Sequence, residues 1–209
     1  MDLNLWIAFA AASTALVFIP GPTVLMVLSY ALSQGRRVAL ATAAGVAVGD
    51  LIAMTASLAG LGALVLASAE LFSVLKWIGA AYLVYLGIRL YRSAGQFSPD
   101  PAATAATLPS KRIFLHAAMV TALNPKSIVF FIAFVPQFVD PGQALMPQFA
   151  ILISTFVGLG AANALIYALL ADRLRSRLLS PAFAALVPRL GGGALTAMGL
   201  ATAISVRTR

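Results

Sequence analysis

Six long apolar runs, separated by short polar segments, occupy most of this sequence. Each run has about 20 to 28 residues, which is enough for an α-helix to cross the roughly 30 Å hydrocarbon core of a bilayer. None of the runs shows the period-two alternation of a membrane β-strand. We therefore expect an all-α integral membrane protein with six transmembrane helices. The expected spans cover about residues 5–30, 39–66, 71–91, 113–139, 144–170 and 183–205.

The composition supports this class and excludes several functions. Hydrophobic residues make up 61% of the chain and charged residues 10%, with a mean hydropathy of +0.97, whereas soluble domains have about 25% charged residues. The net charge of +8 would suggest nucleic acid as the partner of a soluble protein, but here the basic residues lie in short loops, so we expect no nucleic acid. The chain has no cysteine and a single histidine, His116, so we expect no metal cluster and no cofactor.

The basic residues also predict how the chain is oriented in the membrane. They concentrate in the first, third and fifth loops, which should face the cytoplasm, so both termini should lie outside. Arg207 and Arg209 run against this bias. A signal peptide is the competing interpretation of the N-terminus, but such a signal needs a basic start and this chain offers only Asp2, so we expect the first span to be retained. The basic loop residues are Arg36, Arg37, Arg89, Arg92, Lys111, Arg112, Arg173, Arg175, Arg177 and Arg189.

A cluster of helix-breaking residues interrupts the first apolar run: Pro20, Gly21 and Pro22, followed by Thr23. Each proline removes a backbone N–H and pushes its ring against the carbonyl one turn back, so the helix should open here. Lipid cannot satisfy the freed carbonyl groups, and irregular backbone at membrane depth is tolerated where protein or a water-filled cavity surrounds it. The break is therefore a candidate lining of a transport path. A proline kink that serves only packing is the alternative.

A second break, at Asn124, Pro125 and Lys126, lies inside the fourth run. Each half of the chain thus opens with a broken span, continues with a span rich in small residues and closes with a shorter span. Because each half has three spans, related halves would have opposite orientations. We expect one transmembrane domain over residues 1–209, with inverted repeats at about 1–92 and 113–209 and a cytoplasmic loop at about 93–112 between them. Proline breaks at corresponding places point to a binding site at the midplane, and two packing kinks remain the alternative.

Lys126 carries a charge well inside an apolar span, where an unpaired cation costs at least about 2.5 to 3.5 kcal/mol. Asp50 is the acid placed inside another span, so an Asp50–Lys126 pair would offset much of that cost if the two spans are adjacent. A substrate with both an ammonium and a carboxylate group could open such a pair. A permanent ion pair, or a Lys126 amine that reaches the interface along its apolar stem, is the alternative.

Three further residues complete the candidate site. Gly45 and Gly49 form a pattern of small residues that is typical of close helix packing, and Asp50 beside Gly49 makes this face a candidate for an ammonium group or a proton. Asn163 is a polar candidate that could instead bond a neighbouring helix. We therefore predict a translocation site made of Pro20, Gly21, Pro22, Thr23, Gly45, Gly49, Asp50, Asn124, Pro125, Lys126 and Asn163.

Four motifs in their order along the chain resemble the LysE family of bacterial amino-acid exporters, and most closely its homoserine and threonine exporters. The motifs are Pro20-Gly21-Pro22, LKWIGAAYLVYLGI at residues 75–88, NPKSIVFF at residues 124–131 and Pro136-Gln137-Phe138. The resemblance covers nearly the whole chain. It implies a six-span protein of the bacterial inner membrane that exports amino acids or close derivatives, is driven by the proton gradient and is not an enzyme.

The residues and the resemblance combine into one transport hypothesis. Free N–H groups of the helices that begin after Pro22 and Pro125, together with Lys126, would bind the carboxylate of an amino acid. Asp50 and the carbonyls before the prolines would bind its ammonium group, so the site favours a zwitterion, and export would be proton antiport by alternating access. A metal-ion exporter and a membrane-embedded lipid-modifying enzyme are the other candidate functions. A homodimer is one of the assemblies that stay open.

Overall fold

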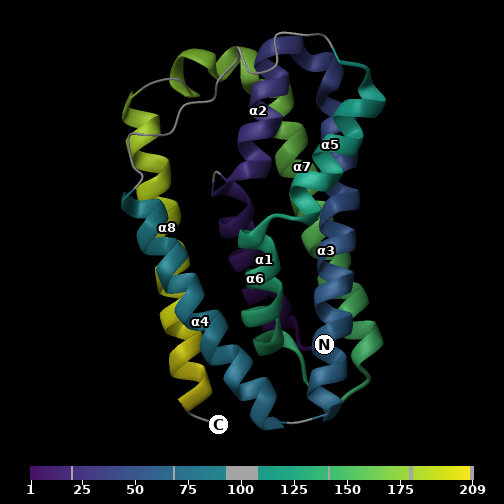
Figure 1. The fold of residues 1–209 in the computed structure, drawn as a ribbon, viewed down its shortest axis with the longest axis vertical. Helices are drawn as coiled ribbons and strands as arrows, with labels where there is room; N and C mark the ends of the chain where they lie inside the picture. Colours follow the sequence, from purple (N-terminus) through teal and green to yellow (C-terminus); the bar gives the residue numbers. More distant parts are fainter. Residues whose placement is uncertain (20, 68, 93–107, 141, 179–180, 208–209) are drawn as a thin grey trace.

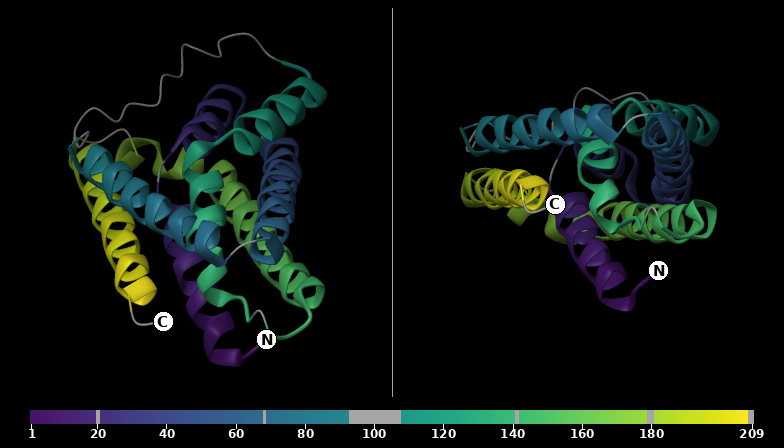
Figure 2. Two further views of the ribbon diagram at one scale, coloured as in Figure 1. Left: turned by 60° about the horizontal axis from the view of Figure 1, so that its bottom comes forward. Right: turned by 90° about the horizontal axis from the view of Figure 1, so that it is seen from below.

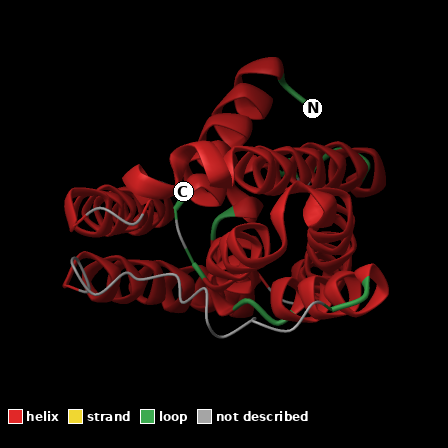
Figure 3. Cartoon of the chain, turned by 90° about the horizontal axis from the view of Figure 1, so that it is seen from above, coloured by secondary structure: helices red, strands yellow, loops and turns green. Residues whose placement is uncertain are grey.

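The computed structural model describes residues 1–19, 21–67, 69–92, 108–140, 142–178 and 181–207. Every regular element in these residues is a helix, which confirms the all-α expectation (Figure 3). Pro20 and most of the expected cytoplasmic loop lie outside the described residues. The elements are α1 (Leu3–Phe18), α2 (Pro22–Gln34), η1 (Gly35–Val38), α3 (Ala39–Ala67), α4 (Ala69–Arg92), α5 (Ser110–Ala122), α6 (Pro125–Ala133), η3 (Val135–Phe138), α7 (Leu145–Leu178) and α8 (Pro181–Arg207), where η marks a 3-10 helix.

Two stretches of the described residues are long and apolar enough to cross a membrane, or three if a bent pair of helices is taken as one span. In the described part of the chain, two stretches qualify alone by length and hydropathy, Pro22–Gly60 and Leu145–Ala171. The segments Ser110–Ala122 and Pro125–Phe138, with a bend of 45° between them, qualify if they are taken together as one span. The chain is thus a helical membrane protein.

Helices α2 and α6 each begin at a proline that directly follows a residue with extended backbone, Gly21 and Asn124 respectively. Helix α1 ends at Phe18. The next described residues, Ile19 and Gly21, have extended backbone, and Pro22 is the first residue of α2. Similarly, α5 ends at Ala122 and Pro125 is the first residue of α6. Proline suits a first helical position because its missing N–H would have no partner there. The Asn124 side chain accepts a hydrogen bond from the Lys126 N–H and so caps α6.

The two interrupted helices run in opposite directions through the bundle. In Figure 1, α1 leads upward to α2, whereas α5 leads downward to α6, and both interruptions lie near the middle of the long axis. The long helices α3 and α7 pack against each other and against these segments. Helices α4 and α8 form a closely packed pair at one side of the bundle (Figures 1 and 2).

Glycines bring helix backbones into contact at the α3–α5 interface. A Cβ atom added to Gly45 would lie 2.5 Å from the Phe114 carbonyl oxygen, and one added to Gly49 would lie 2.6 Å from the Ala118 carbonyl oxygen. Any side chain at either position would therefore push the two helices apart. The α4–α8 pair uses the same device at Gly87, Gly192 and Gly199.

The apolar core consists of two clusters with a polar layer between them. On α3, Val46 belongs to the cluster around α2 and α5, and Ala53 belongs to the cluster around α1 and α6. Asp50 lies between these two positions. On α7, Phe156 and Ala164 belong to the two clusters in the reverse order, so α3 and α7 run antiparallel. The charged side chains of the candidate site are thus confined to the zone where the two clusters meet.

Candidate functional site

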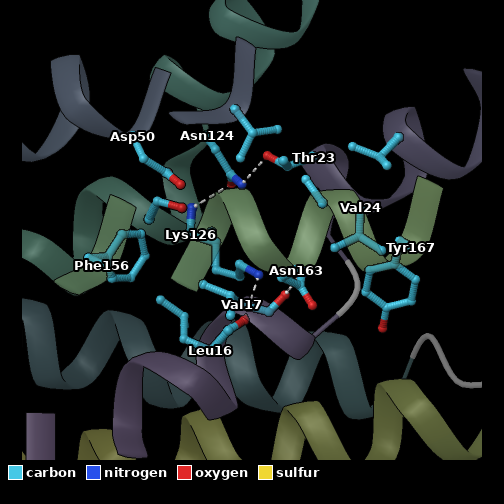
Figure 4. Close-up of a pocket in the computed structure, with 15 residues that line it drawn as sticks. Leu16, Val17, Thr23, Val24, Asp50, Asn124, Lys126, Phe156, Asn163 and Tyr167 are labelled. Carbon is cyan, nitrogen blue, oxygen red and sulfur yellow. Dashed lines mark hydrogen bonds between the residues drawn. The ribbon is translucent and has the colours of Figure 1, made fainter. Parts of the chain in front are cut away.

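A small cavity lies in the polar layer, between the interruptions of the two broken helices. The volume open to the centres of water-sized molecules is about 30 Å³. In the view of Figure 4, Asp50, Asn124 and Thr23 lie above Lys126, and Leu16 and Val17 lie below it. The polar residues that line the cavity are Thr23, Asp50, Asn124, Lys126, Ser127, Asn163 and Tyr167.

Lys126 caps the C-terminal end of α1. Its side chain is only 9% exposed, and its Nζ donates hydrogen bonds to the carbonyl oxygens of Leu16, at 3.0 Å, and Ile19, at 2.8 Å. The last carbonyls of a helix have no partner within the helix and carry the negative end of its dipole, so a cation is favoured there. Gly21 lies against the same amine, because a Cβ on it would be 3.5 Å from Nζ.

Two side chains of α7 donate hydrogen bonds to the carbonyls of Val17 and Phe18, which lie between the two that Lys126 binds. Asn163 Nδ2 donates to the Val17 oxygen at 3.0 Å, and the Tyr167 hydroxyl donates to the Phe18 oxygen at 3.5 Å. Four successive carbonyls at the end of α1, from Leu16 to Ile19, are therefore bonded by side chains from α6 and α7. This arrangement satisfies an open helix end without water or lipid.

Hydrogen bonds also join the two interruptions directly. Asn124 Nδ2 donates to Thr23 Oγ1 at 3.2 Å, while Thr23 Oγ1 lies 3.3 Å from Thr121 Oγ1. Asn124 Oδ1 accepts from the Lys126 N–H at 3.1 Å. One amide side chain thus caps α6 and holds it against the start of α2.

Asp50 supplies the negative charge of the cavity from α3. It is 4% exposed and packs against Gly160 of α7, where a Cβ atom would collide with Oδ2. Within the described residues, Asp50 and Lys126 form no ion pair within 4.0 Å, although both line the cavity. Two opposite charges in one small, water-poor space attract each other more strongly than they would in bulk water.

The structure brings together five of the residues predicted from sequence. Thr23, Asp50, Asn124, Lys126 and Asn163 all line the cavity.

The other predicted residues have different positions. Gly21 lies near the Lys126 amine, which a Cβ atom added to it would contact, and Pro22 and Pro125 are the first residues of the helices beside the cavity. Gly45 and Gly49 lie at the α3–α5 contact and are not among the cavity-lining residues.

Sequence reasoning missed Ser127, Gly160 and Tyr167, which also line the cavity. Tyr167 follows Asn163 by four residues, a spacing that places both side chains on one helix face, so this signal was present in the sequence. No three Asp, Glu, His or Cys side chains among the described residues form a group that could hold a metal ion.

Comparisons with known proteins identify a family and several relatives of this chain. The family model described as LysE type translocator matches residues 14–205. An uncharacterized membrane protein of Vibrio cholerae is 34% identical over 200 residues, which are 96% of this chain and 97% of that protein. A homoserine/homoserine lactone efflux protein of Salmonella typhimurium is 36% identical over 87% of both chains. A leucine efflux protein of Salmonella choleraesuis is 35% identical over 66% of this chain and 64% of that protein. No solved structure matches.

Proposed function

This chain belongs to the LysE family of translocators, which are transporters and not enzymes, and we propose that it exports amino acids or close derivatives from the bacterial cytoplasm. The observation that carries this proposal is the buried cavity between two helix interruptions, with Asp50 and Lys126 in its wall. Intramembrane charges of both signs beside unwound backbone are the elements from which secondary transporters build their substrate sites. The efflux relatives support the substrate class, because their names give homoserine, homoserine lactone and leucine as exported molecules.

The proposed architecture is six spans in two inverted repeats in the inner membrane. Helices α1 and α2 would form the first span and α5 and α6 the fourth, while α3, α4, α7 and α8 would be the other four. The opposite directions of the two broken helices and the antiparallel course of α3 and α7 support this arrangement. Both termini would be periplasmic, and the site would lie near the midplane of the bilayer.

The cavity offers binding groups for both ends of an amino acid. The carbonyls at the end of α1 and the Asp50 carboxylate are acceptors for an ammonium group. The N-terminus of α2 begins at Pro22, has no side-chain cap and would present N–H groups to a carboxylate. The expectation of free N–H groups after Pro125 is wrong, because the N–H groups of Lys126, Ser127 and Ile128 donate to Asn124. Asp50 would also carry the proton, so that export of substrate is coupled to proton entry by alternating access of the two repeats.

A flux experiment with reconstituted protein tests the function. The purified chain is placed in proteoliposomes, a proton gradient is imposed, and the movement of labelled homoserine, threonine, leucine and homoserine lactone is measured. We expect gradient-driven flux of at least one of these. Asp50→Asn should lose the dependence on the gradient, whereas Asp140→Asn, at an exposed loop carboxylate, should keep it. Absence of flux for a broad panel of amino acids would refute the proposal.

A further inference from the structure

Building on the proposed export of amino acids, we propose that Lys126 competes with the substrate from within the site. Its amine occupies the ammonium subsite at the end of α1 when no substrate is bound, and the substrate's α-ammonium group replaces it there. Substrate recognition is therefore an exchange of one primary ammonium for another.

The partners of the Lys126 amine are those that a substrate ammonium needs. The carbonyl oxygens of Leu16 and Ile19 accept its hydrogen bonds at 3.0 and 2.8 Å. A protonated α-amino group has the same three tetrahedral donors and the same charge as a lysine amine, so it fits the same carbonyls. The negative end of the α1 dipole favours either cation equally.

A further acceptor in the cavity wall is ready for such a group. Asn163 is 6% exposed, and its Nδ2 is committed to the Val17 oxygen. This bond fixes the orientation of the amide, and the buried Oδ1 then accepts no hydrogen bond from the described protein groups. A buried acceptor without a donor is unfavourable, so a ligand that donates a hydrogen bond to Asn163 Oδ1 removes that cost.

The size of the cavity requires that a side chain move when substrate enters. A volume of about 30 Å³ for water-sized centres holds only two or three waters at about 10 to 15 Å³ each. Sites for small molecules have about 300 to 1,000 Å³. Lys126 fills the space beside the carbonyls with a flexible four-carbon stem, so its withdrawal opens room where an ammonium group is stabilised.

The displaced amine has a place to go within the same cavity. Asp50 lines the cavity, so its carboxylate is one possible partner for the displaced amine. The carboxylate of an amino-acid substrate, which would enter the same cavity, is a second. Lys126 can therefore exchange its carbonyl partners for a carboxylate partner. A buried cation left without a partner would be strongly unfavourable, and this exchange avoids that cost.

The exchange predicts which ligands bind. A free primary ammonium is required, because it must take the place of the lysine amine. A carboxylate is not required at the α1 subsite, so amino-acid esters and lactones should bind. An N-acetylated amino acid has no ammonium group and should not bind.

Lys126→Met tests the inference, because methionine keeps an apolar stem of similar length and removes the competitor. Binding of leucine methyl ester and of N-acetyl-leucine to the purified full chain is measured by calorimetry at about pH 6, where an α-amino group is protonated. If the lysine occupies the subsite nine-tenths of the time, its removal should strengthen ester binding about tenfold. Lys126→Arg keeps the cation and should give no gain, and N-acetyl-leucine should bind to none of the three proteins.

Equal or weaker ester binding by Lys126→Met would overturn the inference, since a lysine that only assists binding gives that result. If this variant does not fold, the wild-type chain offers a second measurement. It contains three lysines, so the Nζ signal of Lys126 can be assigned in a ¹⁵N-lysine spectrum with Lys76→Arg and Lys111→Arg. Leucine methyl ester should shift this signal and N-acetyl-leucine should not, and ester binding without a shift refutes the exchange. Failure of the wild type to move any amino acid would instead refute the export function.

Discussion

Gly160 gives the most direct test of whether Asp50 acts in transport. A Cβ atom at Gly160 would collide with Asp50 Oδ2, while the next nearest atoms, Asp50 Cγ and Val46 Cγ1, lie 3.5 and 3.8 Å away. The Gly160→Ala substitution should therefore displace the Asp50 carboxylate and leave the packing of α3 on α7 otherwise intact. The carboxylate must rotate away from its position in the cavity wall.

The expected effect on stability is small. A side chain forced from its preferred rotamer costs about 0.5 to 1.5 kcal/mol, and alanine gains about 0.8 to 1 kcal/mol over glycine inside a helix. The two terms oppose each other, so the free energy of unfolding should change by less than about 1 kcal/mol. Transport should fall much further, because the displaced Asp50 carboxylate would lose its proposed hydrogen bond to the substrate ammonium. A charge-assisted hydrogen bond is worth about 1.5 to 3 kcal/mol, and each 1.4 kcal/mol is about tenfold. We expect a loss of about 10- to 100-fold in flux.

The same helix provides the control. A Cβ at Gly158 meets nothing within 4 Å, so Gly158→Ala makes the same chemical change two residues away without touching Asp50. Both variants are compared in the proteoliposome flux assay and by thermal unfolding in detergent. If Gly160→Ala transports as well as Gly158→Ala, the carboxylate position is unimportant and Asp50 is not part of the transport machinery.

Three further predictions concern coupling, packing and the α1 end. Asp50→Asn should abolish accumulation against a gradient while substrate exchange across the membrane continues, because an amide cannot carry the coupling proton; loss of both activities would contradict the coupling role. Gly49→Ala should destabilise the protein by about 1 to 3 kcal/mol in unfolding experiments, because its Cβ would lie 2.6 Å from the Ala118 carbonyl oxygen of α5, and an unchanged midpoint would refute this packing. Asn163→Ala should weaken binding of labelled substrate at least about tenfold. Tyr167→Phe should weaken it about twofold or less, because the 3.5 Å hydrogen bond from Tyr167 to the Phe18 oxygen is long. Equal effects of the two substitutions would contradict the proposed role of the Asn163 amide.

The helix starts at Pro22 and Pro125 could be predicted from sequence because they depend on local chemistry. A proline fixes its own backbone and favours the first position of a helix, wherever the helix then packs. The cavity residues Thr23, Asp50, Asn124 and Lys126 were also identifiable, because a polar side chain inside an apolar span is costly and stands out. Gly45 and Gly49 were identifiable as small residues, but sequence could not tell whether their close neighbour is a substrate or the α5 backbone.

The partners of Lys126 could not be predicted in the same way. Sequence offers Asp50 as the visible opposite charge, whereas the structure gives the amine two carbonyl oxygens of α1. Backbone carbonyls are present at every residue, so no pattern of residue types marks the ones that a helix break leaves free. Which carbonyls Lys126 reaches depends on how α6 docks against the end of α1, and that is decided by the packing of Phe9, Phe130 and their neighbours.

The two interruptions differ in a way that assigns them different roles. At the second, the chain closes its own bonds, because the Leu123 N–H donates to the Met119 oxygen and the Asn124 N–H donates to the Thr121 oxygen. At the first, one backbone bond also forms, from the Ile19 N–H to the Leu16 oxygen, but the carbonyls of Val17, Phe18 and Ile19 are bonded by side chains of other helices.

A helix end that depends on movable side chains can exchange them for a ligand, whereas one closed by its own backbone cannot do so without unwinding. In the proposed exchange, the end of α1 would therefore be the acceptor that changes its partners, and the start of α6, capped by Asn124, would keep its own. An inverted repeat with equivalent breaks would bind a cation equally at either one. With Lys126, Asn163 and Tyr167 placed at the end of α1, we expect the ammonium group of the proposed substrate to bind at the first break.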